Sequence, residues 1–218
     1  MTGNKLTPQI LLNAYSQGVF PMAESRNSNT INWFDPEWRG VFFLDSIHIP
    51  KKLAKKIKQN PFKIYFNKNF NGVIQGCSSY KIDRKSTWIN DEITEVYSSL
   101  FDLGFVYTVE AWDNNNLVGG LYGVTLGGVF FGESMFSLVS DSSKISLIYL
   151  LYMLKKFGYL IVDTQYYTKH LGTFGAKEIH RTRYKKLLNQ AIKIKPMIQP
   201  LPNCLDGSEI LQSITQTS

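Results

Sequence analysis

The chain has 218 residues, 44% of them hydrophobic and 14% aromatic, which is enough to bury a core and form one main domain with a smaller lobe. Its 24 lysines and arginines outnumber 17 acidic residues and give a net charge of +7, which suits a polyanionic partner without identifying nucleic acid. No apolar run is long enough to span a bilayer, and the first residues lack the parts of a signal peptide. We therefore exclude a membrane protein and expect a cytoplasmic one.

The two cysteines, Cys77 and Cys204, belong to no CxxC motif and to no cluster of cysteine and histidine with metal-ligand spacing. We expect both to be inert thiols. We also expect no metal ion and no cofactor, and we expect the protein to be a monomer.

Residues 1–45 are predicted to form a small N-terminal lobe. A short helix is expected over residues 8–16. Aromatic residues over 31–44 indicate two extended segments that are joined by a turn at Asp35-Pro36.

A lysine-rich helix is predicted to follow this lobe. Pro50 has the favoured first-turn position, Leu53 and Ile57 give a one-sided apolar stripe, and Asn60-Pro61 ends the helix. Its other faces carry Lys51, Lys52, Lys55, Lys56 and Lys58. A lysine run is usually a solvated surface, but one without acidic residues also suits contact with phosphates.

Residues 46–192 are predicted to form the main domain. After the lysine-rich helix, the expected elements are a strand at 63–66, helices at 70–77 and 91–103, strands at 105–112, 117–124 and 129–134, a helix at 142–157, a strand at 159–166, a helix at 168–173, a strand at 176–180 and a helix at 183–192. Asn90 can cap the helix at 91–103, and Gly104 can end it. Residues 193–218 are rich in Pro, Gln and Ser, so we expect a loosely ordered tail there.

This order of elements resembles the topology of GNAT-type N-acyltransferases, an α+β fold with a mixed, mainly antiparallel sheet and flanking helices. Enzymes of this fold that use acetyl-CoA hold its pyrophosphate on a glycine-rich loop before the crossover helix. Here the corresponding loop has no glycine between Ser137 and Ser146, so the backbone is not suited to approach a pyrophosphate closely. We expect a donor other than CoA.

Several motifs resemble the leucyl/phenylalanyl-tRNA–protein transferase family. Those in the second half of the chain are GGLYGV, GESMFS with the serine-lysine segment after it, LIVDTQ and LGTFGAKEIHR. Those nearer the N-terminus are AYSQGVFPM, INWFDPEWRG, SIHIPKKL, STWI and EVYSSLFDLGF. Along the chain, the motifs occur in the same order as in the family, and the resemblance covers residues 11–188. The resemblance implies an enzyme that moves leucine or phenylalanine from charged tRNA to the N-terminal amine of proteins beginning with Arg or Lys, which marks them for degradation. An aminoacyl ester is already activated, so the enzyme must mainly align it with a neutral amine.

The resemblance implies three catalytic residues. Asp163 and Gln165 are two apart on a predicted strand and so share a face; in the family this pair positions and deprotonates the incoming amine. Gln165 is assigned as the orienting group and Asp163 as its anionic partner. Glu133, beside Gly132, is assigned to binding of the ester or the acceptor amine. The alternative for each carboxylate is a purely structural hydrogen bond.

The donor side chain needs an apolar, shape-selective pocket, because isobutyl and phenyl groups offer only apolar surface. The candidates are Phe130, Met135, Leu121 and Leu150, although an aromatic residue or leucine in a strand is more often plain core. Phe130 and Met135 are favoured because they flank the GES motif. Trp88 is placed to stack on the terminal adenine of the tRNA, unless it is a buried packing residue. The candidates for contact with tRNA phosphates are Lys51, Lys52, Lys55, Lys56 and Lys144.

The chain departs from the family at three points. Met22 stands where the family usually has a tryptophan that helps to sandwich the adenine, the family's Pro- and Gly-rich N-terminal segment has no counterpart, and Leu121 and Leu150 replace other pocket residues. The preference among Leu, Phe and Met donors therefore stays open. Three alternatives also stay open: a different acceptor amine, a non-catalytic tRNA-binding module and, disfavoured by the glycine-free loop, an acetyl-CoA enzyme.

Overall fold

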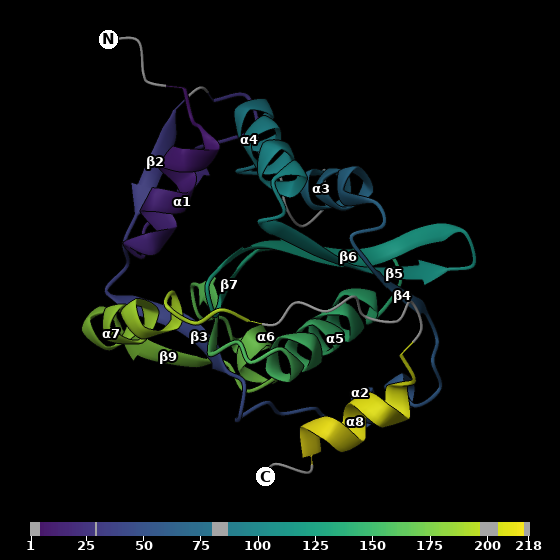
Figure 1. The fold of residues 1–218 in the computed structure, drawn as a ribbon. Helices are drawn as coiled ribbons and strands as arrows, with labels where there is room; N and C mark the ends of the chain where they lie inside the picture. The colour runs from purple at the N-terminus through teal and green to yellow at the C-terminus, as the bar shows by residue number, and fades with distance from the viewer. Residues whose placement is uncertain (1–4, 29, 80–86, 197–204, 216–218) are drawn as a thin grey trace.

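The computed structural model describes residues 5–28, 30–79, 87–196 and 205–215 as helices on both faces of one seven-stranded sheet (Figure 1). The sheet order is β4-β5-β6-β7-β8-β3-β9, and every neighbouring pair is antiparallel except β7 and β8. This is a mixed α+β architecture with a mainly antiparallel sheet, as the sequence predicted.

The strands form in the segments where the sequence predicts them. The main sheet contains β3 (Trp38–Phe43), β4 (Lys63–Phe66), β5 (Val106–Asp113), β6 (Asn116–Leu126), β7 (Val129–Ser137), β8 (Ile161–Gln165) and β9 (Lys177–His180). Gly127, at φ +57°, makes the tight turn between β6 and β7, a left-handed conformation that glycine adopts without steric cost. The three consecutive strands predicted at 105–112, 117–124 and 129–134 are confirmed as β5, β6 and β7, which pair antiparallel as a meander.

Two hydrophobic clusters cover the two faces of the sheet because successive strand residues point to opposite sides. Phe130 and Val162 belong to one cluster, whereas Phe131 and Ile161 belong to the other. The first cluster includes side chains of α2 (Lys51–Ile57), α5 (Ser142–Lys156) and α8 (Gly207–Thr215). The second includes side chains of α1 (Pro8–Ser16), α3 (Phe70–Ser78), α4 (Asp91–Asp102) and α7 (Arg181–Ala191).

The helix ends follow local sequence signals. Asn90 accepts a hydrogen bond from the backbone N–H of Ile93 at 2.8 Å and so caps α4, as predicted, and Gly104 follows α4 at φ +79°. Helix α7 begins two residues earlier than the sequence indicates because the His180 imidazole accepts from the backbone N–H of Thr182 and caps it there. Helix α2 ends at Ile57, before the Asn60-Pro61 signal.

The N-terminal lobe contains α1 and a two-stranded antiparallel sheet of β1 (Phe20–Ala23) and β2 (Ile31–Phe34). The predicted turn at Asp35-Pro36 separates β2 from β3. However, β3 lies inside the main sheet between β8 and β9, so the last strand of the segment 1–45 is a structural part of the main domain.

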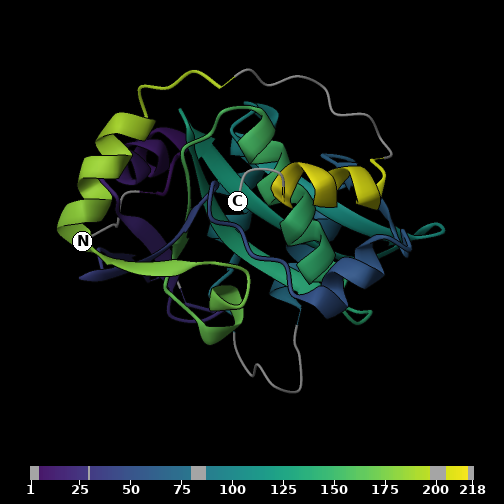
Figure 2. The same ribbon diagram turned by 90° about the horizontal axis from the view of Figure 1, so that it is seen from below.

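The tail contains a helix that the sequence analysis did not predict. Ile210, Leu211 and Ile214 of α8 are buried in the first cluster, and Figure 2 shows α8 lying against α5. The apolar side of α8 packs on the first cluster, on the side away from the sheet. The expectation of a loosely ordered tail is therefore wrong for residues 207–215. Cys204 lies outside the described residues, Cys77 is buried, and none of the described helices is long and apolar enough to cross a membrane.

Candidate active site

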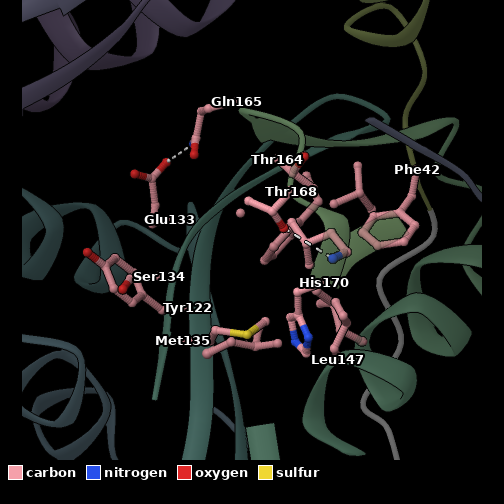
Figure 3. Close-up of a pocket in the computed structure, with 16 residues that line it drawn as sticks. Phe42, Tyr122, Glu133, Ser134, Met135, Leu147, Thr164, Gln165, Thr168 and His170 are labelled. Atoms are coloured by element: carbon pink, nitrogen blue, oxygen red, sulfur yellow. Dashed lines mark hydrogen bonds between the residues drawn. The ribbon is translucent and has the colours of Figure 1, made fainter. Parts of the chain in front are cut away.

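A cavity of about 270 Å³ lies where β7 and β8 separate (Figure 3). The two strands pair only over Val129–Phe131 and Ile161–Asp163, and the residues that follow on each strand line the cavity. The lining side chains come from Phe42, Leu121, Tyr122, Phe130, Glu133, Ser134, Met135, Leu147, Leu150, Val162, Thr164, Gln165, Thr168, His170 and Leu171, with Gly132 completing the wall.

The structure brings together all four residues that the sequence named for an apolar pocket. Leu121, Phe130, Met135 and Leu150 all line this cavity. Their position is thus confirmed, while their role with an amino-acid side chain stays a prediction. The sequence analysis missed His170 of the short helix α6 (Lys169–Gly172), a polar residue that lines the same wall.

Glu133 and Gln165 lie at the polar end of the cavity, with Met135 and His170 at the other end (Figure 3). Gln165 Nε2 donates to Glu133 Oε1 at 3.4 Å. The hydroxyl of Tyr15 donates to the same oxygen at 2.5 Å, and the hydroxyl of Tyr97 donates to Oε2 at 2.9 Å. A carboxylate is therefore held by hydroxyl donors from α1 and α4 on one side and meets an amide on the other.

Burial of Glu133 raises the pKa of its carboxyl from 4.5 to about 7. The hydrogen bonds from Tyr15 and Tyr97 oppose this rise, the negative charge of Asp163 adds to it, and the positive charge of Arg39 opposes it. A carboxyl with a pKa near neutrality can both take up and release a proton at physiological pH. Burial also raises the pKa of both tyrosines, so they stay protonated donors.

Asp163 lies beneath this end of the cavity and does not line it. Its side chain has no exposed surface. Both carboxylate oxygens accept hydrogen bonds from Arg39, at 2.8 and 2.6 Å, and the Tyr184 hydroxyl donates to Oδ2 at 2.5 Å. The alternative of a structural hydrogen bond is thus present for this carboxylate, and its partner is a buried arginine. The sequence placed Asp163 and Gln165 on one face of the strand, but only Gln165 lines the cavity.

Gln165 ends β8 in a strained backbone conformation. Its φ is +58°, in the left-handed region that side chains other than glycine seldom adopt. The backbone N–H of Gln165 donates to Asp163 Oδ1 at 2.8 Å, which holds this conformation. The buried carboxylate therefore fixes the residue whose side chain reaches the cavity.

The lysine candidates divide between two environments. Lys52 and Lys144 line a second hollow with Ser140, Asp141 and His170, so it shares a wall with the apolar cavity. Lys56 and Lys144 both donate to Asp141, at 3.0 and 2.6 Å, and these partners lower the pKa of its carboxyl to about 2, Lys144 acting most strongly. Lys51 and Lys55 are exposed on α2 and do not line this hollow.

The two adenine candidates lie outside the cavity lining. Trp88 and Met22 are each partly buried and pack against the second hydrophobic cluster. The side chain of Asn90 donates to the backbone oxygen of Ser28 at 2.9 Å, which ties the segment after Trp88 to the loop between β1 and β2. Their role in adenine stacking stays a prediction.

Tyr15 and Tyr97 lie within the quoted motifs AYSQGVFPM and EVYSSLFDLGF, but the resemblance gave neither residue a role. Tyr15 belongs to an amphipathic helix and Tyr97 occupies a helical core position, so neither has a local signal for contact with Glu133. Arg39 does have a signal, because a charged residue in the apolar strand WRGVFF must find a partner. Among the described residues, no group of three or more His, Cys, Asp and Glu side chains could hold a metal ion.

The fold and the site together define an α+β protein with an enzyme-type centre, in which a carboxylate and an amide meet beside an apolar cavity. A family model described as leucyl/phenylalanyl-tRNA protein transferase matches residues 41–189, and the model for that family's N-terminal domain matches residues 4–37. The leucyl/phenylalanyl-tRNA–protein transferase of Maricaulis maris (strain MCS10) is 45% identical over 208 residues, which cover 95% of this chain and 96% of that protein.

The chain therefore belongs to the leucyl/phenylalanyl-tRNA protein transferase family. The resemblance in the sequence is thereby confirmed, and with it the assignment as an aminoacyltransferase that moves leucine or phenylalanine from aminoacyl-tRNA to protein N-termini. Among solved structures, L-PGS from Bacillus licheniformis matches with a TM-score of 0.39 and 13% identity, over 71% of this chain. This chain spans about half of that structure's length, 51%.

Proposed function

We propose that this enzyme transfers leucine or phenylalanine to the N-terminal amine of proteins that begin with Arg or Lys, and that this marks them for degradation in the cytoplasm. The observation that carries the proposal is the apolar cavity that ends at Glu133 and Gln165. One part of such a cavity suits an aliphatic or aromatic side chain, and the other suits an ester and an amine. The acceptor class rests on the family resemblance.

The donor side chain occupies the part of the cavity lined by Phe130, Met135, Leu121 and Leu150. These side chains offer apolar surface only, so they favour Leu, Phe or Met over polar residues. Both Phe130 and Leu150 are almost fully buried beneath the cavity, which makes its floor stiff.

The reaction is aminolysis of the aminoacyl ester. The acceptor nitrogen forms a bond to the ester carbonyl carbon, and the bond from that carbon to the ribose oxygen breaks. We assign the proton transfer to Glu133 instead of the Asp163–Gln165 pair that the resemblance implied, because burial brings the pKa of Glu133 to about 7 and Asp163 does not line the cavity. Glu133 takes the proton from the attacking amine and passes it to the leaving ribose oxygen. The side-chain amide of Gln165 donates a hydrogen bond to the ester and so orients the ester. Asp163 acts through the backbone of Gln165 and does not touch the substrate.

The tRNA approaches over α2. Lys52, Lys56 and Lys144 gather around the hollow beside the cavity, and Lys51 and Lys55 extend the positive surface along the helix. Trp88, with Met22 in the place of the usual second aromatic residue, receives the terminal adenine. This arrangement leaves the aminoacyl group to enter the apolar cavity.

A CoA donor is disfavoured by the loop before α5. This loop has no glycine between Ser137 and Ser146, so its backbone is not suited to approach a pyrophosphate closely. Asp141, the N-cap of α5, makes no side-chain capping hydrogen bond and is paired with Lys56 and Lys144 instead.

A transfer assay tests the proposed function. The purified protein is mixed with radiolabelled leucyl- or phenylalanyl-tRNA and with peptides that begin with Arg, Lys, Asp or Ala. We expect label on the Arg and Lys peptides only, loss of transfer by roughly 100-fold in Gln165→Ala because the ester is no longer aligned, and full transfer in the control Gln190→Ala, an exposed glutamine on α7. Labelling of Asp or Ala peptides would assign a different acceptor, and no label above the no-enzyme level would refute the proposal.

A further inference from the structure

Arg39 is a fully buried charged residue outside the cavity lining. It extends from β3, its side chain has no exposed surface, and its Nε and Nη2 atoms donate to both oxygens of Asp163. Two parallel hydrogen bonds between a guanidinium and a carboxylate are short, strong and directional. Such a pair fixes the orientation of both side chains, whereas a lysine in the same place would offer only a point charge.

The guanidinium of Arg39 also binds the N-terminal lobe. Its carbon lies 4.6 Å from the ring centroid of Phe20 in β1 and 4.5 Å from that of Tyr184 in α7, so the cation is sandwiched between two aromatic faces. The remaining donor, Nη1, bonds the backbone oxygen of Gly18 at 3.0 Å. One side chain thus joins the segment 18–20, the strand β3 and the helix α7.

The other end of this chain of contacts is the cavity. Asp163 Oδ1 accepts from Arg39 Nε and from the backbone N–H of Gln165, so the same oxygen is shared between the arginine and the catalytic strand end. A left-handed φ at a residue with a side chain is strained and persists only when its surroundings enforce it. Without an oriented Asp163, the backbone of Gln165 would relax and its amide would leave Glu133.

We propose that Arg39 is a positioning residue for the transfer reaction, which acts through Asp163 to hold Gln165 at the cavity and makes catalysis depend on docking of the segment 18–20. This inference rests on the proposed function, because it takes aminoacyl transfer as the activity that is lost. Arg39 touches no substrate. Its effect therefore falls on the rate of the chemical step rather than on binding of the tRNA.

The test compares variants that separate charge from geometry. Arg39→Lys keeps the positive charge and loses the paired hydrogen bonds. Tyr184→Phe keeps the aromatic face and removes only the hydroxyl that donates to Asp163. The double variant Arg39→Met with Asp163→Asn removes both charges together. Arg26→Lys, the same change at an exposed arginine, is the matched control.

We expect Arg39→Lys to lower kcat for leucyl transfer roughly 10- to 100-fold while the KM for leucyl-tRNA changes less than about twofold, because a small displacement of an aligning group slows the reaction by such factors. Tyr184→Phe is expected to show a smaller fall in kcat of the same kind. The double variant should keep the wild-type pH dependence, since the positive and the negative charge near Glu133 are removed together. Its kcat should still be low, since no paired hydrogen bonds orient the side chain that accepts from Gln165. Thermal melting of each variant identifies any that do not fold.

Three results would overturn the inference. The first is a wild-type kcat in a folded Arg39→Lys variant. The second is a loss of kcat in Arg26→Lys that equals the loss in Arg39→Lys. The third is a slower transfer by Arg39→Lys that comes entirely from a higher KM for leucyl-tRNA. A wild-type protein that labels no peptide refutes the proposed function instead, so the two failures are distinct. If Arg39→Met in the double variant prevents folding, Arg39→Lys and Tyr184→Phe still decide the question.

Discussion

Glu133 is a carboxylate on which hydroxyl and amide donors converge from three elements. Tyr15 comes from α1, Tyr97 from α4 and Gln165 from β8. Burial raises its pKa to about 7, so the group changes charge in the range where the enzyme works. At a lower pH the carboxyl is neutral and cannot take a proton from an amine.

The transfer rate should therefore rise with pH through about 7 in the wild type. Tyr15, Tyr97, Asp163 and Arg39 lie around Glu133, and burial raises the pKa of both tyrosines further from neutrality. We expect Glu133→Gln to lower the rate about 100-fold or more, and its residual rate to follow only the acceptor amine, whose pKa is near 8. Initial rates from pH 5.5 to 9, corrected for uncatalysed ester hydrolysis, test this; an unchanged pH profile in the variant would exclude Glu133 as the base.

The same substitution should change stability with a predictable sign. Because the folded state raises the pKa of Glu133, ionisation of this group costs stability as pH rises from 4.5 through about 7. We expect Glu133→Gln to melt at a higher temperature than wild type at pH 8, and the difference to vanish below pH 4.5, where both side chains are neutral. A higher melting temperature for wild type at pH 8 would contradict the raised pKa.

At the scale of elements, helix α2 and the start of α5 face each other across Asp141. This residue has a φ of +70° and accepts hydrogen bonds from Lys56 of α2 and Lys144 of α5. The acid keeps two lysines together that would otherwise repel each other. Lys52 and Lys144 then line the hollow beside the cavity.

Removal of these lysines should weaken tRNA binding through its electrostatic part. The slope of log affinity against log salt concentration is negative, and its size grows with the number of phosphate contacts. In the double variant Lys52→Ala, Lys144→Ala, we expect this slope to become shallower by about 0.7 to 1 for each lysine removed. Filter binding of leucyl-tRNA between low and moderate salt gives the slope. Lys177→Ala, an exposed lysine on β9, is the control. Equal slopes in the double variant and the wild type would show that the hollow does not contact tRNA phosphates.

The sequence predicted the elements well where a local pattern encodes them. Asn90, which caps α4, and Gly127, which turns the chain between β6 and β7, act on neighbours within a few residues. The pairing of Arg39 with Asp163 spans 124 residues and that of Tyr15 with Glu133 spans 118, so no local pattern contains them. The motif resemblance found Asp163, Gln165 and Glu133 but gave no role to Arg39, Tyr15 or Tyr97, although the quoted motifs contain all three partners.

At the scale of the whole molecule, the C-terminal segment completes the first hydrophobic cluster. Polar composition led us to expect a loosely ordered tail, yet Ile210, Leu211 and Ile214 recur at helical spacing and are buried. The spacing was the better signal than the composition. Helix α8 packs on α2 and α5, the two helices that carry the proposed phosphate contacts.

A truncated core side chain on α8 should therefore lower stability and leave the chemical step unchanged. For Ile210→Ala, we expect the free energy of unfolding to fall by about 2 kcal/mol or more, because a buried side chain is replaced by a cavity. Urea unfolding measures the loss, and kcat for leucyl transfer should stay within about twofold of wild type. Ser213→Ala on the exposed side of α8 is the control. Equal stability of both variants would show that α8 does not dock in solution.

The position of β3 in the sheet affects how the protein folds during synthesis. It occupies residues 38–43, yet its hydrogen-bonded neighbours are β8 at 161–165 and β9 at 177–180. The ribosome releases the N-terminal part of a chain first, and Arg39 precedes its partner Asp163 by 124 residues. A growing chain that has not reached β8 therefore carries β3 without its sheet neighbours and a guanidinium without its carboxylate. Gln165 and the carboxylate that fixes its backbone arrive together on β8, so the polar end of the cavity forms in one late step of folding.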